Sequence, residues 1–257
     1  MKILKNYLIF LLPIFAGCSS MYIPSPKPTP LFEKKGETQI EVGTSINSPF
    51  LIASYSFSEK YALIGSGSLS YRNFMNVYER PGMEFDLFSF PDGAFAHRAV
   101  ELGIGRYNIR PSSNYKLEVF IGGMYGNAKE NKDWKNNYYQ CFIQTNIGRK
   151  KEHFELGGAF RLAFSLFDNY KPYKYSPSSS PQVLHNTFGV AHTEALLFMK
   201  FGGENLKGVF RFGLNVAIPF ISTSNREIIW HRPIENRNYS LFHISIGLTY
   251  RFNMKSK

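Results

Sequence analysis

Apolar residues alternate with small or polar residues along most of the chain from Glu37 onward. The clearest run covers residues 154–166, where Phe and Leu fill every even position except Gly158, and Glu, Arg, Ser and small residues fill the odd ones. A period of two is typical of a β-strand, whose successive side chains point to opposite faces. Because no segment shows a convincing helical period, the pattern predicts an all-β protein.

Ten segments carry this alternation and are expected to form strands. Several of them reach the ~9–11 residues that a tilted transmembrane strand requires, whereas a strand of a soluble protein commonly has ~5–6. The expected strands are Glu37–Ile46, Pro49–Phe57, Tyr61–Asn73, His97–Asn108, Tyr115–Gly126, Asn137–Arg149, His153–Phe167, Thr187–Lys200, Lys207–Pro219 and Tyr239–Phe252.

The expected connections are short and long in turn, apart from a first hairpin at Asn47-Ser48. The short turns are Ser58–Lys60, Ile109–Asn114, Lys150–Glu152 and Phe201–Leu206, and the long loops are Phe74–Ala96, Asn127–Asn136, Asp168–Asn186 and Phe220–Asn238. Short turns at one end and long loops at the other are the pattern of outer-membrane barrels. The chain is therefore predicted to be an all-β, ten-stranded antiparallel up-and-down barrel of the outer-membrane type over residues 37–252, with a tail over 253–257.

Periodicity alone does not say which face of the strands points into the barrel. A membrane barrel turns its apolar face toward lipid, whereas a soluble barrel buries it. The other face combines small residues with charges of both signs, which could pair in a narrow lumen or lie in water outside a soluble barrel. We expect a polar network in the lumen, made by Glu155, Arg161, His192, Glu194, Arg211 and Arg251.

The N-terminus begins with Lys2 and Lys5, continues with an apolar run over residues 7–15, and reaches Phe15-Ala16-Gly17-Cys18. The run is too short to span a bilayer. It resembles a bacterial lipoprotein signal, although Phe15 stands where such signals usually have Leu. This resemblance implies that residues 1–17 are removed and that Cys18 carries lipid. Alternating prolines then predict a semi-rigid tether over residues 18–36.

The layout resembles that of outer-membrane β-barrel lipoproteins of Bacteroidota. The residues that carry the resemblance are the lipoprotein signal, Met21-Tyr22-Ile23-Pro24, and the stretch from Pro30 to Glu37 that leads into the first strand. Tyr250-Arg251-Phe252 is also similar to the aromatic strand that commonly ends such barrels. The resemblance implies a lipid-anchored protein of the outer membrane and supplies no activity.

The chain is basic, with a formal charge of +11 that becomes +9 without Lys2 and Lys5. Export makes nucleic acid an improbable partner, so lipopolysaccharide or an acidic glycan is the expected anionic ligand. Three of the long loops combine cations with aromatic residues, which can stack on sugars and pair with phosphates. The candidate contacts are Lys132, Trp134, Lys135, Trp230, Arg232 and Arg237.

The two cysteines leave Cys141 without a disulfide partner if Cys18 carries lipid. The sequence has no Cys/His cluster of the kind that binds zinc, so we expect neither a metal nor a cofactor.

One local pattern suggests catalysis. His243-Ile244-Ser245 places a base and a hydroxyl on one face of a strand, and lipid A deacylases use such a pair with a nearby Glu on barrel strands. No acid follows Ser245 in this chain. His192 and Glu194 could be an acid/base pair, but a structural role is favoured.

We therefore expect a lipid-anchored outer-membrane barrel with a structural or cell-surface interaction role and no catalysis. The alternatives are a lipid A deacylase-like barrel hydrolase and a soluble periplasmic barrel that binds a ligand on a lipid tether. The oligomeric state stays open.

Overall fold

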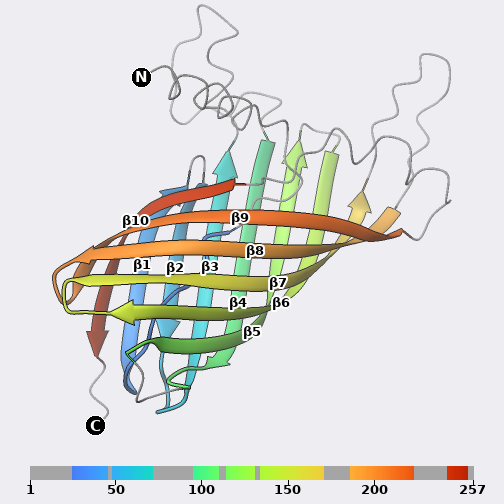
Figure 1. Ribbon diagram of the computed structural model, residues 1–257. Helices are drawn as coiled ribbons and strands as arrows, with labels where there is room; N and C mark the ends of the chain where they lie inside the picture. The colour runs from blue at the N-terminus through green and yellow to red at the C-terminus, as the bar shows by residue number, and fades with distance from the viewer. Residues whose placement is uncertain are drawn as a thin grey trace, which may run out of the picture.

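The computed structural model describes residues 25–45, 48–71, 95–109, 114–130, 134–170, 186–222 and 242–253. Ten strands form one sheet in which each pairs antiparallel with the next, and the last pairs with the first to close a barrel (Figure 1). The predicted fold class is confirmed. The strands are β1 (Glu37–Ser45), β2 (Ser48–Tyr55), β3 (Tyr61–Tyr71), β4 (Phe95–Arg106), β5 (Lys116–Glu130), β6 (Trp134–Lys150), β7 (Phe154–Tyr170), β8 (Asn186–Gly202), β9 (Leu206–Ser222) and β10 (Phe242–Asn253).

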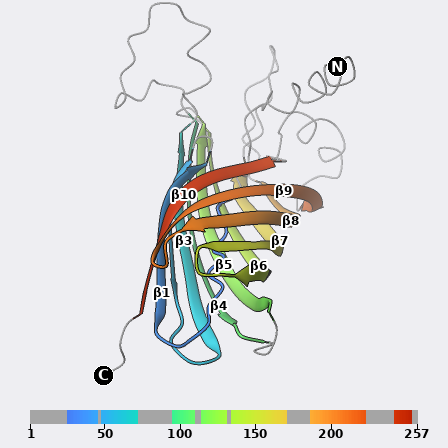
Figure 2. The same ribbon diagram turned by 60° about the vertical axis from the view of Figure 1, so that its left-hand side comes forward.

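The apolar face of the strands lies on the outside of the barrel. Phe160 and Leu162 are 47% and 48% exposed, whereas Arg161 between them is fully buried. The same parity holds in β9, where Leu214 is exposed and Arg211 is buried. The strands of the front wall cross those of the back wall at a steep angle (Figures 1 and 2), as expected of a closed and tilted sheet. A belt of apolar side chains therefore surrounds a polar interior.

Exposed aromatic residues ring the end of the barrel that carries the short turns. They stand at the ends of β3, β7, β8 and β10 and before β5, and each is between 41% and 58% exposed: Tyr61, Tyr115, Phe154, Phe201 and Tyr250. Amphipathic aromatic rings are typical of the level at which a membrane protein meets the lipid headgroups. These residues mark the boundary of the apolar belt at the short-turn end, which is taken here as the lower end of the barrel.

Most strand bounds agree with the sequence-based expectation to within a few residues, and two differ instructively. The predicted long loop Asn127–Asn136 is wrong, because β5 and β6 stay paired from Asn127↔Asn137 to Glu130↔Trp134 and leave only residues 131–133 between them. Polar residues suggested a loop there, but paired strands can continue into water. Strand β9 passes Pro219 and ends at Ser222, and its register with β8 shifts beside that proline, which lacks the N–H that a regular ladder uses.

Residues 25–36 are called here the N-terminal strap, and residues 25–32 of it lie inside the barrel. Leu31 and Phe32 are fully buried, and Ser25, Lys27 and Thr29 are 3%, 3% and 2% exposed. The strap leads from the middle of the lumen to the short-turn end, where the Gly36 N–H donates to the Ser56 carbonyl over 2.7 Å. Gly36 has a φ of 81°, which glycine adopts without strain and which lets the chain reverse into β1. The alternating prolines gave no indication of this position inside the barrel.

Candidate functional site: the closed lumen

A bidentate ion pair spans the lumen. Arg161 of β7 donates through Nη1 and Nη2 to the two carboxylate oxygens of Glu101 of β4, over 2.6 and 2.8 Å. Its Nε donates to Gln144 over 2.9 Å, and its guanidinium lies 4.0 Å from the ring centre of Phe142. Both charged side chains are fully buried. Such fork-to-fork pairs are among the strong hydrogen-bonded pairs because both partners are ionised.

A second bidentate pair joins β9 to β1. Arg211 donates to both carboxylate oxygens of Glu41, and the Nη2–Oε2 distance is 2.7 Å. The same Nη2 lies 3.4 Å from the Thr29 hydroxyl of the N-terminal strap. Arg211 is fully buried, so its charge depends on these partners for compensation. The pair also links the two strands that flank β10, across the seam where the barrel closes.

The N-terminal strap suits a lumen that is rich in donors. Pro26, Pro28 and Pro30 have no backbone N–H, so the buried strap mainly needs partners for its carbonyl groups. The barrel wall supplies them through long polar side chains. The Pro28 carbonyl accepts from Gln144 and Asn146, the Thr29 carbonyl from Lys200 over 2.6 Å, and the Pro30 carbonyl from Gln39 and Arg251.

Two further contacts fix the strap at its ends. Lys27 forms an ion pair with Glu194 of β8, and both side chains are almost fully buried. Lower in the barrel, the Phe32 N–H donates to the Glu118 carboxylate over 2.7 Å. The strap is thus held by charge at mid-lumen and by backbone hydrogen bonds toward the short-turn end.

A network of acids and bases closes the short-turn mouth. Glu155 lies 2.9 Å from Lys207 and 3.0 Å from Arg251, and Glu37 lies 2.9 Å from the same Arg251. Glu33 of the strap bridges Lys150 and Lys116 at 3.0 and 3.4 Å. Partial burial alone would raise the pKa of the Glu33 carboxyl, but the two ammonium groups outweigh burial and lower this pKa below its ordinary value.

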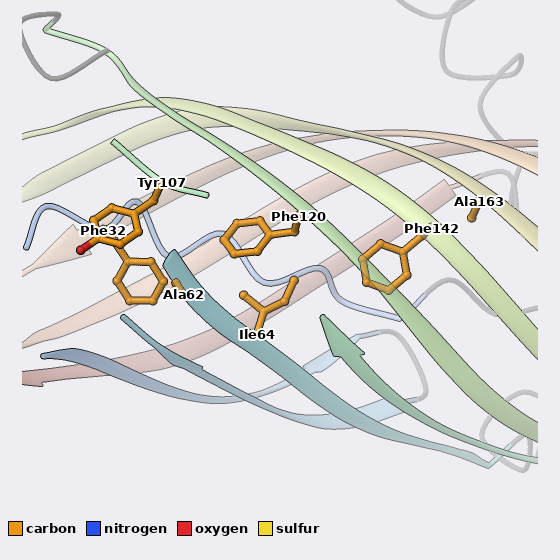
Figure 3. Packing of buried hydrophobic residues seen from close by; sticks show 7 residues of the cluster. All are labelled: Phe32, Ala62, Ile64, Tyr107, Phe120, Phe142 and Ala163. Atoms are coloured by element: carbon orange, nitrogen blue, oxygen red, sulfur yellow. The ribbon is translucent and has the colours of Figure 1, made fainter. Parts of the chain in front are cut away.

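Apolar side chains fill the space between these polar layers. Figure 3 shows the lower cluster, in which the Phe32 ring of the strap lies beside Tyr107, with ring centres 5.5 Å apart. The lower cluster also contains Ala62, Ile64, Phe120, Phe142 and Ala163. The upper cluster contains Ala99, Met124, Tyr138, Phe167 and Val190. In the upper cluster the Tyr138 hydroxyl lies 2.7 Å from His97 Nε2. Strap, ion pairs and aromatic rings together occlude the lumen within the described residues.

Glycines on the inner face make room for these rings. A Cβ built at Gly126 would overlap the Tyr138 ring, and one at Gly122 would overlap the Phe142 ring and the backbone of β4. A ring that lies flat on a neighbouring glycine fills a narrow barrel without pushing the strands apart. Glycine in these strands is therefore a packing requirement.

The residues of the predicted lumen network all point inward, but both buried arginines make bidentate pairs with acids outside the predicted set. Arg161 faces Glu194 in the register of β7 and β8, yet Glu101 on the opposite wall accepts its bidentate hydrogen bonds. Glu155 and Arg251 do come together. Sequence reasoning missed Lys27 and Glu41. The alternation in residues 37–45 puts Glu41 on the same face as Glu37 and Gln39, so the sequence contained a signal for it. No pattern in the sequence indicated a role for Lys27.

The candidate catalytic pair is not assembled. His243 and Ser245 are both buried on the inner face of β10. Neither His243 Nε2 nor the Ser245 hydroxyl makes a hydrogen bond within the described residues, so they do not bond each other. A serine nucleophile needs a base within hydrogen-bond reach. His192 and Glu194 likewise lie buried on the inner face of β8. Among the described residues, no group of three or more His, Cys, Asp and Glu could hold a metal ion.

The remaining predicted positions fall mainly outside the described residues. These are Cys18, Lys132, Trp230, Arg232 and Arg237. Trp134 and Lys135 belong to β6, but their side chains are not described. No helix among the described residues is long and apolar enough to cross a membrane.

No protein-family model matches the chain, and no curated protein matches it. Among solved structures, it is similar to the outer membrane protease OmpT from Escherichia coli, at 12% identity and a TM-score of 0.44, over 84% of this chain and 93% of that one. It is also similar to the copper transporter OprC, at 13% identity and a TM-score of 0.33, over 89% of this chain and 37% of that one. These likenesses are too distant to assign a role to any residue of this chain.

Proposed function

We propose that the protein is a lipid-anchored outer-membrane β-barrel with a structural or cell-surface interaction role, whose lumen is closed by its own N-terminal strap. The observation that carries the proposal is the pairing of an apolar outer belt with an occluded, ion-paired interior. A soluble barrel would bury the face that carries Phe160 and Leu162, and here that face is exposed. A diffusion pore needs open space where the strap and its partners lie.

The membrane location is tested with the intact mature protein. A barrel of this type stays in the membrane fraction after carbonate washing and migrates differently on gels with and without heating. Cys141 offers an internal probe, because it is exposed on the outer face of β6. In membranes it should react with a lipid-soluble maleimide and resist a charged, water-soluble one. Equal reaction with both reagents in intact membranes would contradict the proposal.

The lipid anchor is tested at Cys18. The residues that support it are the apolar run and Ala16-Gly17 before that cysteine. Labelled palmitate should enter the parent protein and not the Cys18→Ser variant, and equal labelling of the two would refute the anchor.

The interaction role is assigned to the long-loop end. Its support is the concentration of cations and aromatic residues in the sequence around Lys132, Lys135, Arg232 and Arg237. Binding of lipopolysaccharide or an acidic glycan there should weaken with salt, since the Debye length falls from ~10 Å at 0.1 M to ~3 Å at 1 M. Replacing the four cations together by Gln should reduce binding while the heat-modifiable barrel persists. Unchanged binding would remove this part of the proposal.

The lipid A deacylase alternative has a direct test. His243 and Ser245 make no hydrogen bond with each other, so we expect no acyl transfer at this pair. Expression should leave the lipid A acyl chains unchanged in mass spectra, in the parent as in Ser245→Ala. Shortened chains that return to full length in Ser245→Ala would replace the structural role by an enzymatic one.

A further inference from the structure

One row of the outer wall has a gap. Strand pairing places Ile147, Gly158, Leu197 and Phe212 side by side on neighbouring strands β6 to β9. Ile147 and Leu197 project from the barrel and are 51% and 65% exposed. Gly158 has no side chain, so a notch lies between two large apolar neighbours.

The notch belongs to a larger apolar groove near the short-turn end. The groove has a volume of about 790 Å³, and Leu156, Met199 and Phe210 extend its walls. This volume falls within the ~300–1,000 Å³ that is usual for sites that bind small molecules. The groove is continuous with the exposed apolar belt, so in a membrane its natural occupant is an acyl chain.

The end of the groove nearest the short turns is basic. Arg149 and Lys151 line it, and both are exposed. Tyr115, one of the exposed aromatic residues around the short-turn end, lines it as well. No acidic side chain is among the described residues that line the groove. Arginine and lysine bind phosphate oxygens through charge-assisted hydrogen bonds. The groove therefore matches both parts of a phospholipid. Its apolar length suits an acyl chain, and its two cations lie where a headgroup phosphate would be.

We propose that this groove is a binding site for one anionic phospholipid of the leaflet that meets the short turns. The acyl chain occupies the notch over Gly158, and the headgroup phosphate binds Arg149 and Lys151. The proposal rests on the membrane location proposed above. Because lipid tails are as apolar as the groove itself, the fit of the notch retains the chain and the two cations select the headgroup.

Native mass spectrometry of the mature protein in detergent micelles tests the site, with phosphatidylglycerol and phosphatidylcholine added at equal concentration. The parent should retain one phosphatidylglycerol in preference to phosphatidylcholine. The Arg149→Gln/Lys151→Gln variant should lose that preference, by roughly fivefold for each cation removed. Gly158→Leu, which fills the notch, should retain less of both lipids.

Matched controls lie on another part of the same barrel. Lys60 and Arg106 are exposed near the short-turn end, and Lys60→Gln/Arg106→Gln removes the same charge there. Gly67 stands on the outer face of β3, where the nearest atom to an added Cβ is 4.0 Å away, so Gly67→Leu adds the same bulk. Neither control should change lipid retention.

Two results would overturn the inference: no preference for phosphatidylglycerol in the parent, or equal losses in the site and control variants. Should Gly158→Leu not fold, the charge variant alone decides. Retention of the parent in carbonate-washed membranes is measured in parallel. A protein that stays in membranes but shows no lipid preference overturns this inference alone, whereas a protein released by carbonate overturns the proposed function.

Discussion

Arg161 and Glu101 face each other across the lumen as a fully buried, bidentate ion pair that joins β7 to β4. Removing one partner leaves the other charge buried without its bidentate counter-ion, so Arg161→Met or Glu101→Leu should each cost about 3–5 kcal/mol of unfolding free energy. The double variant should cost much less than the sum. Urea unfolding in micelles measures all three, and additive losses would show that the two residues are not coupled.

The contact between Gly126 and Tyr138 predicts a steric effect. Gly126→Ala places a methyl group against the Tyr138 ring and should destabilise the barrel by about 1–3 kcal/mol, the usual range for overpacking. Adding Tyr138→Leu should recover part of the loss. Gly67→Ala, with open space around its Cβ, is the matched control and should be close to neutral. The measurement is the temperature at which half of each variant changes from the folded to the unfolded mobility on a gel. Equal temperatures for the two glycine variants would disprove the steric account.

The outward position of Leu162 predicts a lipid-dependent penalty. Leu162→Arg should impair assembly by about 2–4 kcal/mol if the residue lies near the bilayer midplane. Leu162→Ala introduces no charge and should be milder. Spin labels along β7 should report lipid at even positions and protection at odd ones. The opposite parity in the spin-label data would favour a soluble barrel.

The bridge from Glu33 to Lys150 and Lys116 predicts a loss of stability in acid. The folded protein lowers the pKa of Glu33, so the bridge stabilises the fold above the ordinary carboxyl value of 4.5 and is lost as pH falls through the folded value. The stability difference between the parent and Glu33→Gln should therefore be present in full above pH 4.5 and shrink as the pH falls below 4.5 through the lowered pKa of Glu33. A difference that is constant over this range would argue against the bridge.

The sequence predicted those features that depend on neighbours along one strand. Arg161 and Leu162 were assigned to opposite faces because strand side chains alternate, and their exposures differ accordingly. Pairing across the lumen was not accessible in this way. Arg161 was expected to share a lumen network with Glu194 on the next strand, but its position relative to Glu101 depends on the curvature of the closed barrel, which no local pattern encodes.

The N-terminal strap shows a second limit of the sequence. Alternating prolines predict an extended chain, and an extended chain can lie in water or in a lumen. What places this one inside is the supply of donors from Gln144, Lys200 and Arg251, which come from three different strands. Only the assembled barrel brings those donors to one place.

The strap also constrains the order of assembly. It immediately precedes β1, and β1 closes the barrel by pairing with β10, the last of the ten described strands in chain order. This segment is enclosed by that seam and paired with β8 through Lys27 and Glu194, so we expect it to be in place when the seam forms. The later strands would then close around the N-terminal strap. Contacts between chain ends this distant in sequence make folding slow, so we expect shortening the strap to reduce the yield of closed barrels before it changes the stability of those that form.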